Sequence, residues 1–151
     1  MGIPPDLIEL LREFAAADVK YLVIGGYAQG FHAVPRFTKD VDFWLDPAPE
    51  NIQRTIIALS NFGAPRETLE AVKALSGLDV AWLGHPPLRF DFMTSVPGGE
   101  FQSAWSSRVT TTWEGTPAHV VSRDWLLVLK RASGRPQDLV DVLLLEQGME
   151  T

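Results

Sequence analysis

Apolar and polar positions alternate along the chain with two periods, one of three to four residues and one of two. The longer period predicts helices at residues 5–17, 26–33, 49–62, 67–75, 101–107, 124–132 and 137–146. Short runs rich in β-branched and aromatic residues predict strands at residues 20–24, 37–45, 79–83, 88–93, 109–113 and 119–121. This order predicts an α/β fold with one mixed central sheet, flanking helices and C-terminal helices. The length of 151 residues is typical of a single domain, residues 1–151.

Three features carry finer predictions. Helix 49–62 is expected to bury a stripe formed by Ile52, Ile56, Leu59 and Phe62. The segment 114-EGTP-117 predicts a hairpin turn between the last two strands. The tryptophans are expected to lie in the core rather than to stack on bases, with Trp44 as the exception to watch because it shares the face of Asp40 and Asp42: Trp44, Trp82, Trp105, Trp113 and Trp125.

Carboxylates interrupt two of the predicted strands. In strand 37–45, alternation places Asp40, Asp42 and Trp44 on one face. Asp91 lies in the apolar run 88-LRFDFMT-94, and it would join Asp40 and Asp42 if the two strands were neighbours in the sheet. Three clustered carboxylates repel one another and resist ionisation unless a cation balances them. Magnesium prefers such oxygen ligands, and two metals about 4 Å apart suit in-line displacement at phosphorus.

A plainer interpretation of these aspartates stays open. Each could cap a turn, lie on a solvated edge, or pair with a nearby basic residue such as Arg36, Lys39 or Arg89.

A pair of glycines, Gly25-Gly26, separates the buried strand 20–24 from the next predicted helix. Glycine allows backbone amides to approach a ligand closely, and a helix N-terminus favours an anion such as a triphosphate. A tight strand-to-helix turn is the alternative. The chain contains neither GxGxxG nor GxxxxGK[ST], so Rossmann and P-loop sites have no support.

Composition narrows the classes of partner. The formal net charge of −6 disfavours tight binding to nucleic acid, which we expect at most as an acceptor of a transferred group. No apolar run is long enough to predict a membrane span. The absence of cysteine excludes thiolate metal sites and fits a cytoplasmic protein.

Three short motifs together resemble a known family. The pieces 24-IGG-26, 40-DVDF-43 and 90-FDF-92 resemble the nucleotidyltransferase fold of the DNA polymerase β superfamily. The fuller string from Gly25 to Trp44, and 130-KRASGRPQDLVDVLLL-145, resemble small bacterial nucleotidyltransferase-like proteins related to abortive-infection and toxin–antitoxin transferases.

The resemblance implies roles for five residues. Gly25 and Gly26 would hold a nucleoside triphosphate, although many active members carry serine at the second position. Asp40 and Asp42 would bind two metal ions, Mg²⁺ or Mn²⁺. Asp91 would bind the catalytic metal and help to activate the attacking hydroxyl.

Two residues before the aspartate pair are further candidates. Arg36 could meet a phosphate of the nucleotide, and Thr38 could orient Asp40. The alternatives are a solvated arginine and an ordinary β-branched strand residue.

A basic cluster near the C-terminus offers one more nucleotide contact. The resemblance suggests that Lys130 faces the triphosphate, whereas a cation at a helix end also complements the helix dipole. Asp138 and Asp141 are expected to pair with Arg135 or to cap the last helix.

Two functional hypotheses follow. The first is a metal-dependent nucleotidyltransferase that passes a nucleoside monophosphate from a triphosphate to a hydroxyl of a protein, a tRNA end or a small molecule. The second is a catalytically silent module that keeps the scaffold and acts with a partner protein, as in a toxin–antitoxin pair. The carboxylate trio favours the first hypothesis, and the small size favours a partner.

Overall fold

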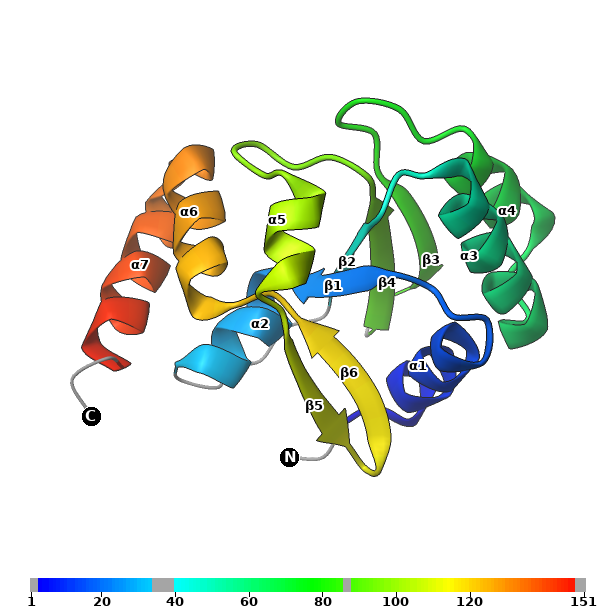
Figure 1. Ribbon diagram of the computed structural model, residues 1–151, viewed down its shortest axis with the longest axis horizontal. Helices are drawn as coiled ribbons and strands as arrows, with labels where there is room; N and C mark the ends of the chain where they lie inside the picture. Colours follow the sequence, from blue (N-terminus) through cyan, green and yellow to red (C-terminus); the bar gives the residue numbers. More distant parts are fainter. Residues whose placement is uncertain (1–2, 34–39, 86–87, 149–151) are drawn as a thin grey trace.

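The computed structural model describes residues 3–33, 40–85 and 88–148 and has the predicted mixed α/β architecture (Figure 1). The elements, in chain order, are α1 (Pro5–Ala16), β1 (Tyr21–Ile24), α2 (Gly25–His32), β2 (Asp40–Leu45), α3 (Pro49–Phe62), α4 (Arg66–Lys73), β3 (Ala81–His85), β4 (Leu88–Met93), α5 (Phe101–Ser106), β5 (Val109–Trp113), β6 (Thr116–Val120), α6 (Arg123–Ser133) and α7 (Pro136–Gly148).

Within the described residues the sheet has six strands in the order β3-β4-β2-β1-β6-β5. Strand β2 runs parallel to β4 and antiparallel to β1, and β1 runs parallel to β6. The outer strands β3 and β5 are each antiparallel to their neighbour. The fold-class prediction of one mixed sheet is therefore confirmed.

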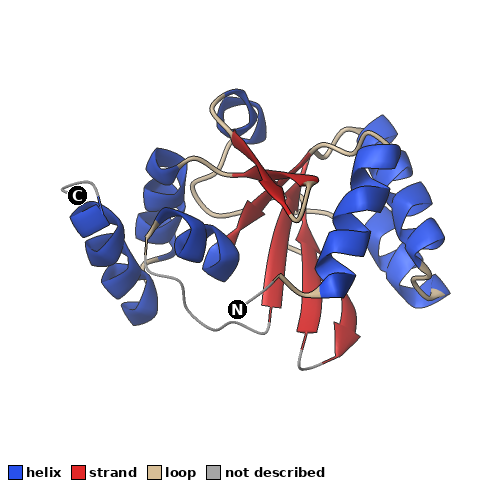
Figure 2. Cartoon of the chain, turned by 90° about the horizontal axis from the view of Figure 1, so that it is seen from below, coloured by secondary structure: helices blue, strands red, loops and turns tan. Residues whose placement is uncertain are grey.

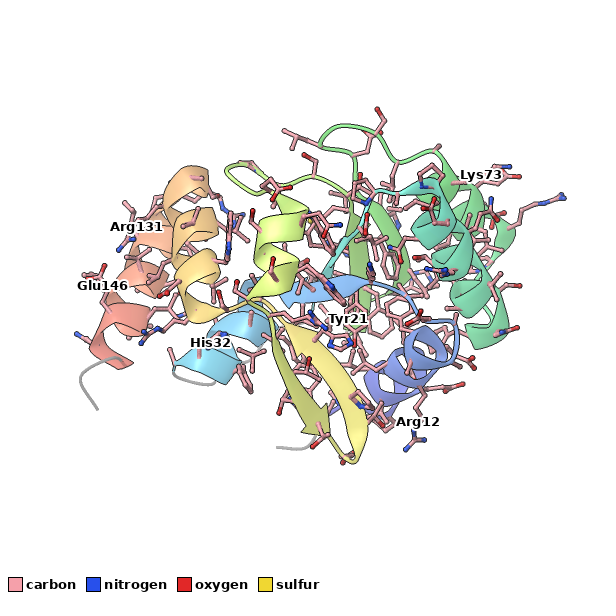
Figure 3. The ribbon with its side chains drawn as sticks, viewed as in Figure 1. Arg12, Tyr21, His32, Lys73, Arg131 and Glu146 are labelled. Carbon is pink, nitrogen blue, oxygen red and sulfur yellow. The ribbon has the colours of Figure 1, made fainter. Side chains whose placement is uncertain are left out.

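Apart from α5, the described helices form two groups at opposite sides of the strands (Figure 2). Helices α1, α3 and α4 gather on one side, and α2, α6 and α7 contact one another on the other (Figure 1). The end of α2 is held by His32, whose Nε2 lies 2.7 Å from the carbonyl oxygen of Val121 (Figure 3). None of the helices in the described ranges is long and apolar enough to cross a membrane.

An aromatic core fills the space between α1 and the central strands. The ring of Phe43 stacks on Phe92 with centroids 5.6 Å apart, and Phe14 of α1 meets Phe43 edge-on at 5.3 Å. Because strand side chains alternate, burying Val41 and Phe43 on this face directs Asp40 and Asp42 to the opposite face.

The buried face of α3 differs from the predicted stripe. Leu59 is fully buried as expected, but Ile52, Ile56 and Phe62 are only partly buried, and Asn51 and Thr55 are buried instead. The Asn51 amide explains the rotation, because it accepts from Lys20 N at 2.7 Å and donates to the carbonyl oxygens of Lys20 and Asp46. Helix α3 therefore turns a polar residue inward to tie the start of β1 to the end of β2.

Strands β3 and β6 differ from their predicted bounds by two or more residues, and β3 begins at Ala81 rather than at residue 79. Strand β6 begins at Thr116 rather than at residue 119, because the turn has only two central residues, Glu114 and Gly115, both with positive φ. This conformation matches the twist of a two-residue hairpin. Strand β3 runs to His85 rather than ending at residue 83, because His85 still pairs with Leu88 of β4.

Candidate active site

The junction between β1 and α2 brings the diglycine against the aspartates. Helix α2 begins at Gly25, directly after the fully apolar strand β1. Gly25 has a φ of 68°, and a Cβ at this position would collide with the Asp42 carboxylate. Glycine is thus needed both for the backbone conformation and for the close approach to Asp42. Gly26 follows in the first turn of α2.

Asp42 and Asp91 are paired directly across the neighbouring parallel strands β2 and β4. Two residues earlier in the same register, Asp40 is paired with Arg89. The side chain of Asp91 is only 11% exposed, whereas that of Asp40 is 47% exposed. The condition set by the sequence, that the two strands be neighbours, is met, and the three carboxylates lie on one face.

Within this cluster, Asp42 has a strongly raised pKa. Burial raises the pKa of Asp42 to about 7, aided by the charge of Asp91, a hydrogen bond between the two carboxyl groups and the charge of Asp40. Arg89 partly offsets this rise. A carboxyl pair of this kind holds a proton where a bound cation would otherwise balance the charge.

Arg89 is the counter-ion of the other two carboxylates. Its Nε donates to Asp91 Oδ1 at 2.9 Å, and its Nη2 donates to Asp91 Oδ2 at 3.1 Å and to Asp40 Oδ2 at 3.4 Å. The plainer interpretation, in which a nearby arginine pairs with the aspartates, therefore applies to Asp40 and Asp91.

The carboxylates are ligands of the type that a divalent cation prefers, but they are not arranged as a complete coordination site. Among the described residues, no three His, Cys, Asp or Glu side chains are grouped so that they could hold an ion. The Asp42–Asp91 carboxyl pair nevertheless supplies the oxygen ligands that Mg²⁺ prefers, with Asp40 on the same face. Both oxygens of Asp91 accept hydrogen bonds from Arg89, so a bound ion would share these oxygens with the guanidinium or displace it.

A cavity of about 310 Å³ opens beside the carboxylates. Its size suits a small ligand. The sheet contributes Asp42 and Asp91, the start of α2 contributes Gly25, and the C-terminal helices and their connection contribute Lys130, Arg135 and Asp138. Val80, Met93 and Val96 form part of the apolar wall.

Lys130 lines this cavity but its ammonium group is paired with α7. Nζ lies 2.8 Å from Asp141 Oδ2 and 3.5 Å from Asp138 Oδ1, and the lysine side chain is only 7% exposed. The pairing expected between Asp138 and Arg135 is present, with Arg135 Nε 2.8 Å from Asp138 Oδ2.

Arg135 is a site residue whose place the sequence did not indicate. The hydrogen bond and charge of Asp138 raise the pKa of Arg135, and the charge of Asp42 adds to this effect. Its side chain is 75% exposed, so it offers a positive charge to the cavity. The only sequence signal was its membership of the basic cluster that contains Lys130.

The tryptophan prediction is right for Trp44 and wrong for Trp82. Trp44 shares the face of Asp40 and Asp42 and is buried, with its ring 5.4 Å from Phe101. Trp82 is 62% exposed, because β3 is the edge strand and no further strand covers it in the described part of the sheet. Trp105, Trp113 and Trp125 are partly buried against the core. Arg36 and Thr38 lie outside the described residues.

Comparison with solved structures defines the class of fold. The lincosamide antibiotic adenylyltransferase LnuA, lincomycin-bound, has a TM-score of 0.60 and 16% identity over 96% of this chain and 97% of that chain. ANT(2'')-Ia in complex with adenylyl-2''-tobramycin has a TM-score of 0.60 and 13% identity over 95% and 87% of the two chains. An antigenic nucleotidyltransferase-like protein from Paracoccidioides brasiliensis has a TM-score of 0.54 and 16% identity over 99% and 78%.

The chain therefore has the nucleotidyltransferase fold, as its motifs predicted. No family model matches the chain, and no curated protein sequence matches it.

Proposed function

We propose that the protein is a metal-dependent nucleotidyltransferase. It transfers a nucleoside monophosphate from a nucleoside triphosphate to a hydroxyl group of an acceptor. The observation that carries this proposal is the direct pairing of Asp42 with Asp91 on neighbouring parallel strands, with Gly25 packed against Asp42 beside a cavity. In the reaction, a bond forms between the acceptor oxygen and the α-phosphorus, and the bond to the β-phosphate oxygen breaks. Pyrophosphate leaves, and the hydroxyl proton passes to a base.

The triphosphate is assigned to the side of the cavity formed by the β1–α2 junction. Backbone amides of Gly25 and Gly26 at the start of α2 favour an anion. Arg135 and Lys130 add positive charge to the facing wall, although Lys130 is also needed to balance α7. Arg36 and Thr38, which precede Asp40, remain proposed contacts of the phosphates or of Asp40.

Asp40, Asp42 and Asp91 are the proposed ligands of Mg²⁺ or Mn²⁺. When bound, the metal would neutralise the charge of the reacting phosphates and of the leaving pyrophosphate. The ion would share the oxygens of Asp91 with Arg89 or displace its guanidinium. Asp91 lies on the β4 side of the pair, farther from Gly25, and is the proposed acceptor of the hydroxyl proton.

A small hydroxylated molecule is the proposed acceptor. Two of the structures that share the fold were solved with lincomycin and with adenylyl-2''-tobramycin, so the scaffold accommodates acceptors of that size.

Nucleotide binding tests the proposal directly. Titration calorimetry with ATP, CTP, GTP and UTP should show Mg²⁺-dependent binding of at least one triphosphate to the native protein. Asp42→Asn should abolish this binding while the protein stays folded. Asp6→Asn, at an exposed position of α1, is the matched control and should bind as the native protein does. Failure of all four nucleotides to bind, or unchanged binding by Asp42→Asn, would contradict the proposal.

The second candidate function is a catalytically silent module that acts with a partner protein, such as a toxin–antitoxin component. The observation that favours it is the apolar surface of α7, where Leu139, Val140 and Leu143 are each more than half exposed. Absence of nucleotide binding together with a stable complex that Leu143→Glu disrupts would favour this function over catalysis.

A further inference from the structure

Trp82 lies on the same face of the sheet as the carboxylates. It pairs directly with Asp91 across the antiparallel strands β3 and β4, and directly paired residues project to the same face. Its neighbours Ala81 and Leu83 are buried on the opposite face, in the core. The exposed indole is therefore one strand beyond Asp91, about 5 Å away in the pairing direction.

A single row of paired residues crosses the four strands that form the site. Ile24, directly before Gly25, pairs with Asp42, Asp42 pairs with Asp91, and Asp91 pairs with Trp82. The diglycine junction and Trp82 thus lie on opposite sides of the carboxylate pair. This order gives the two reactants of the proposed transfer separate places.

In-line displacement requires the attacking oxygen and the leaving pyrophosphate to be on opposite sides of the phosphorus. If the pyrophosphate rests at the Gly25 side, the acceptor approaches across Asp91 from the β3 side. There the surface is apolar, since Trp82 is 62% exposed and the preceding Leu78 and Val80 are 65% and 44% exposed.

We propose that Trp82 is the platform on which the acceptor stacks, and that the acceptor is a small molecule with a hydroxylated ring and an amine cation. This inference rests on the proposed function. An indole face packs against a ring and attracts a cation.

The indole is not needed to hold the fold together. The backbone of Trp82 is anchored through its carbonyl oxygen, which accepts a hydrogen bond from the Thr68 hydroxyl at 3.1 Å. This bond does not involve the side chain. Trp82→Ala should therefore fold, and Trp82→Phe keeps an aromatic face.

The test compares Trp82→Ala, Trp82→Phe and Leu143→Ala, an exposed apolar control on α7. Calorimetry first measures the Mg²⁺-bound triphosphate, which all three variants should bind as the native protein does. With a non-reacting analogue of that nucleotide bound, tobramycin and lincomycin are then titrated as probes. We expect at least one probe to bind, with Kd raised about tenfold or more by Trp82→Ala. Trp82→Phe should restore most of the affinity, and Leu143→Ala should leave it unchanged.

Three outcomes would overturn the assignment of Trp82. They are binding of neither probe, equal probe affinity in Trp82→Ala, and a changed oligomeric state in Trp82→Ala, which would assign the indole to an interface between copies. Lost nucleotide binding in the native protein would instead contradict the proposed function itself, so the two failures are distinguishable.

Discussion

Arg89 supplies one positive charge to two aspartates, Asp40 and Asp91. It holds both oxygens of Asp91 and reaches Asp40, while Asp42 is left to a carboxyl–carboxyl hydrogen bond and a raised pKa. The guanidinium thus balances the cluster only in part. At the scale of single residues, the Mg²⁺ that we propose for this site would compete with Arg89 for Asp91.

Replacing Arg89 tests this competition. In the presence of a chelator, Arg89→Met should lower Tm, because Asp40 and Asp91 lose their counter-ion. Added Mg²⁺ should recover more of the Tm in this variant than in the native protein, since the ion no longer competes with a guanidinium. Thermal unfolding with and without Mg²⁺ measures both effects.

Arg66→Met is the control for the Arg89 experiment. It removes a comparable but exposed ion pair, Arg66–Glu70 on α4, and should change neither Tm nor the response to Mg²⁺. If Arg89→Met gained no more from Mg²⁺ than the native protein, a metal site at these aspartates would be contradicted.

At the scale of elements, two basic residues of α6, Lys130 and Arg131, form ion pairs with α7 in different surroundings. Lys130–Asp141 is buried, with side chains 7% and 0% exposed. Arg131–Glu146 is about half exposed and lies on the outer side of the two helices (Figure 3). Because Lys130 also lines the cavity, the buried pair links the packing of α7 to the shape of the site.

The two pairs should differ greatly in their effect on stability. Lys130→Met leaves Asp141 as a buried charge without its cation, and it should lower the free energy of unfolding by about 3 kcal/mol. Arg131→Met should lower it by less than about 1 kcal/mol, since its pair is solvated. Urea unfolding measures both values. Similar values for the two variants would show that the Lys130 pair is not the buried clamp described above.

The sequence predicted the bounds of helices and strands well where these bounds depend on a local pattern. Helix 49–62 and strand 88–93 have the predicted bounds, because helical spacing and β-rich runs report local geometry. The buried face of α3 was misjudged, since Asn51 turns inward to bond Lys20 and Asp46. That choice depends on where β1 and β2 lie, and periodicity contains no information on this.

At the scale of the whole molecule, the cavity joins two parts of the chain that are far apart in sequence. Asp42 and Asp91 come from the sheet and Gly25 from the start of α2, whereas Lys130 and Arg135 come from the C-terminal helices and their connection. The helices α3 and α4 lie on the other side of the strands (Figure 1). A ligand in the cavity would therefore stabilise one group of helices in preference to the other.

Hydrogen exchange measured by mass spectrometry should show this asymmetry. Addition of Mg²⁺ and the triphosphate that binds should slow exchange in α2 and in α6–α7, because bound ligand opposes local opening of the segments that contact it. Exchange in residues 49–73, covering α3 and α4, should change little. Asp42→Asn is the control and should show no protection. Protection confined to α3 and α4 would place the ligand elsewhere.

The sequence by itself determined the alternation of the elements, the face shared by Asp40, Asp42 and Trp44, and the diglycine at a strand–helix junction. Each is a consequence of local backbone geometry, which sequence period reports directly. Only the tertiary structure decided that β2 and β4 are neighbours with Asp42 opposite Asp91, that Arg89 holds two of the carboxylates, and that β3 is an edge strand that exposes Trp82. These facts depend on which distant segments pair in the sheet. That pairing is decided by the packing of many core residues together, which the local sequence pattern does not report.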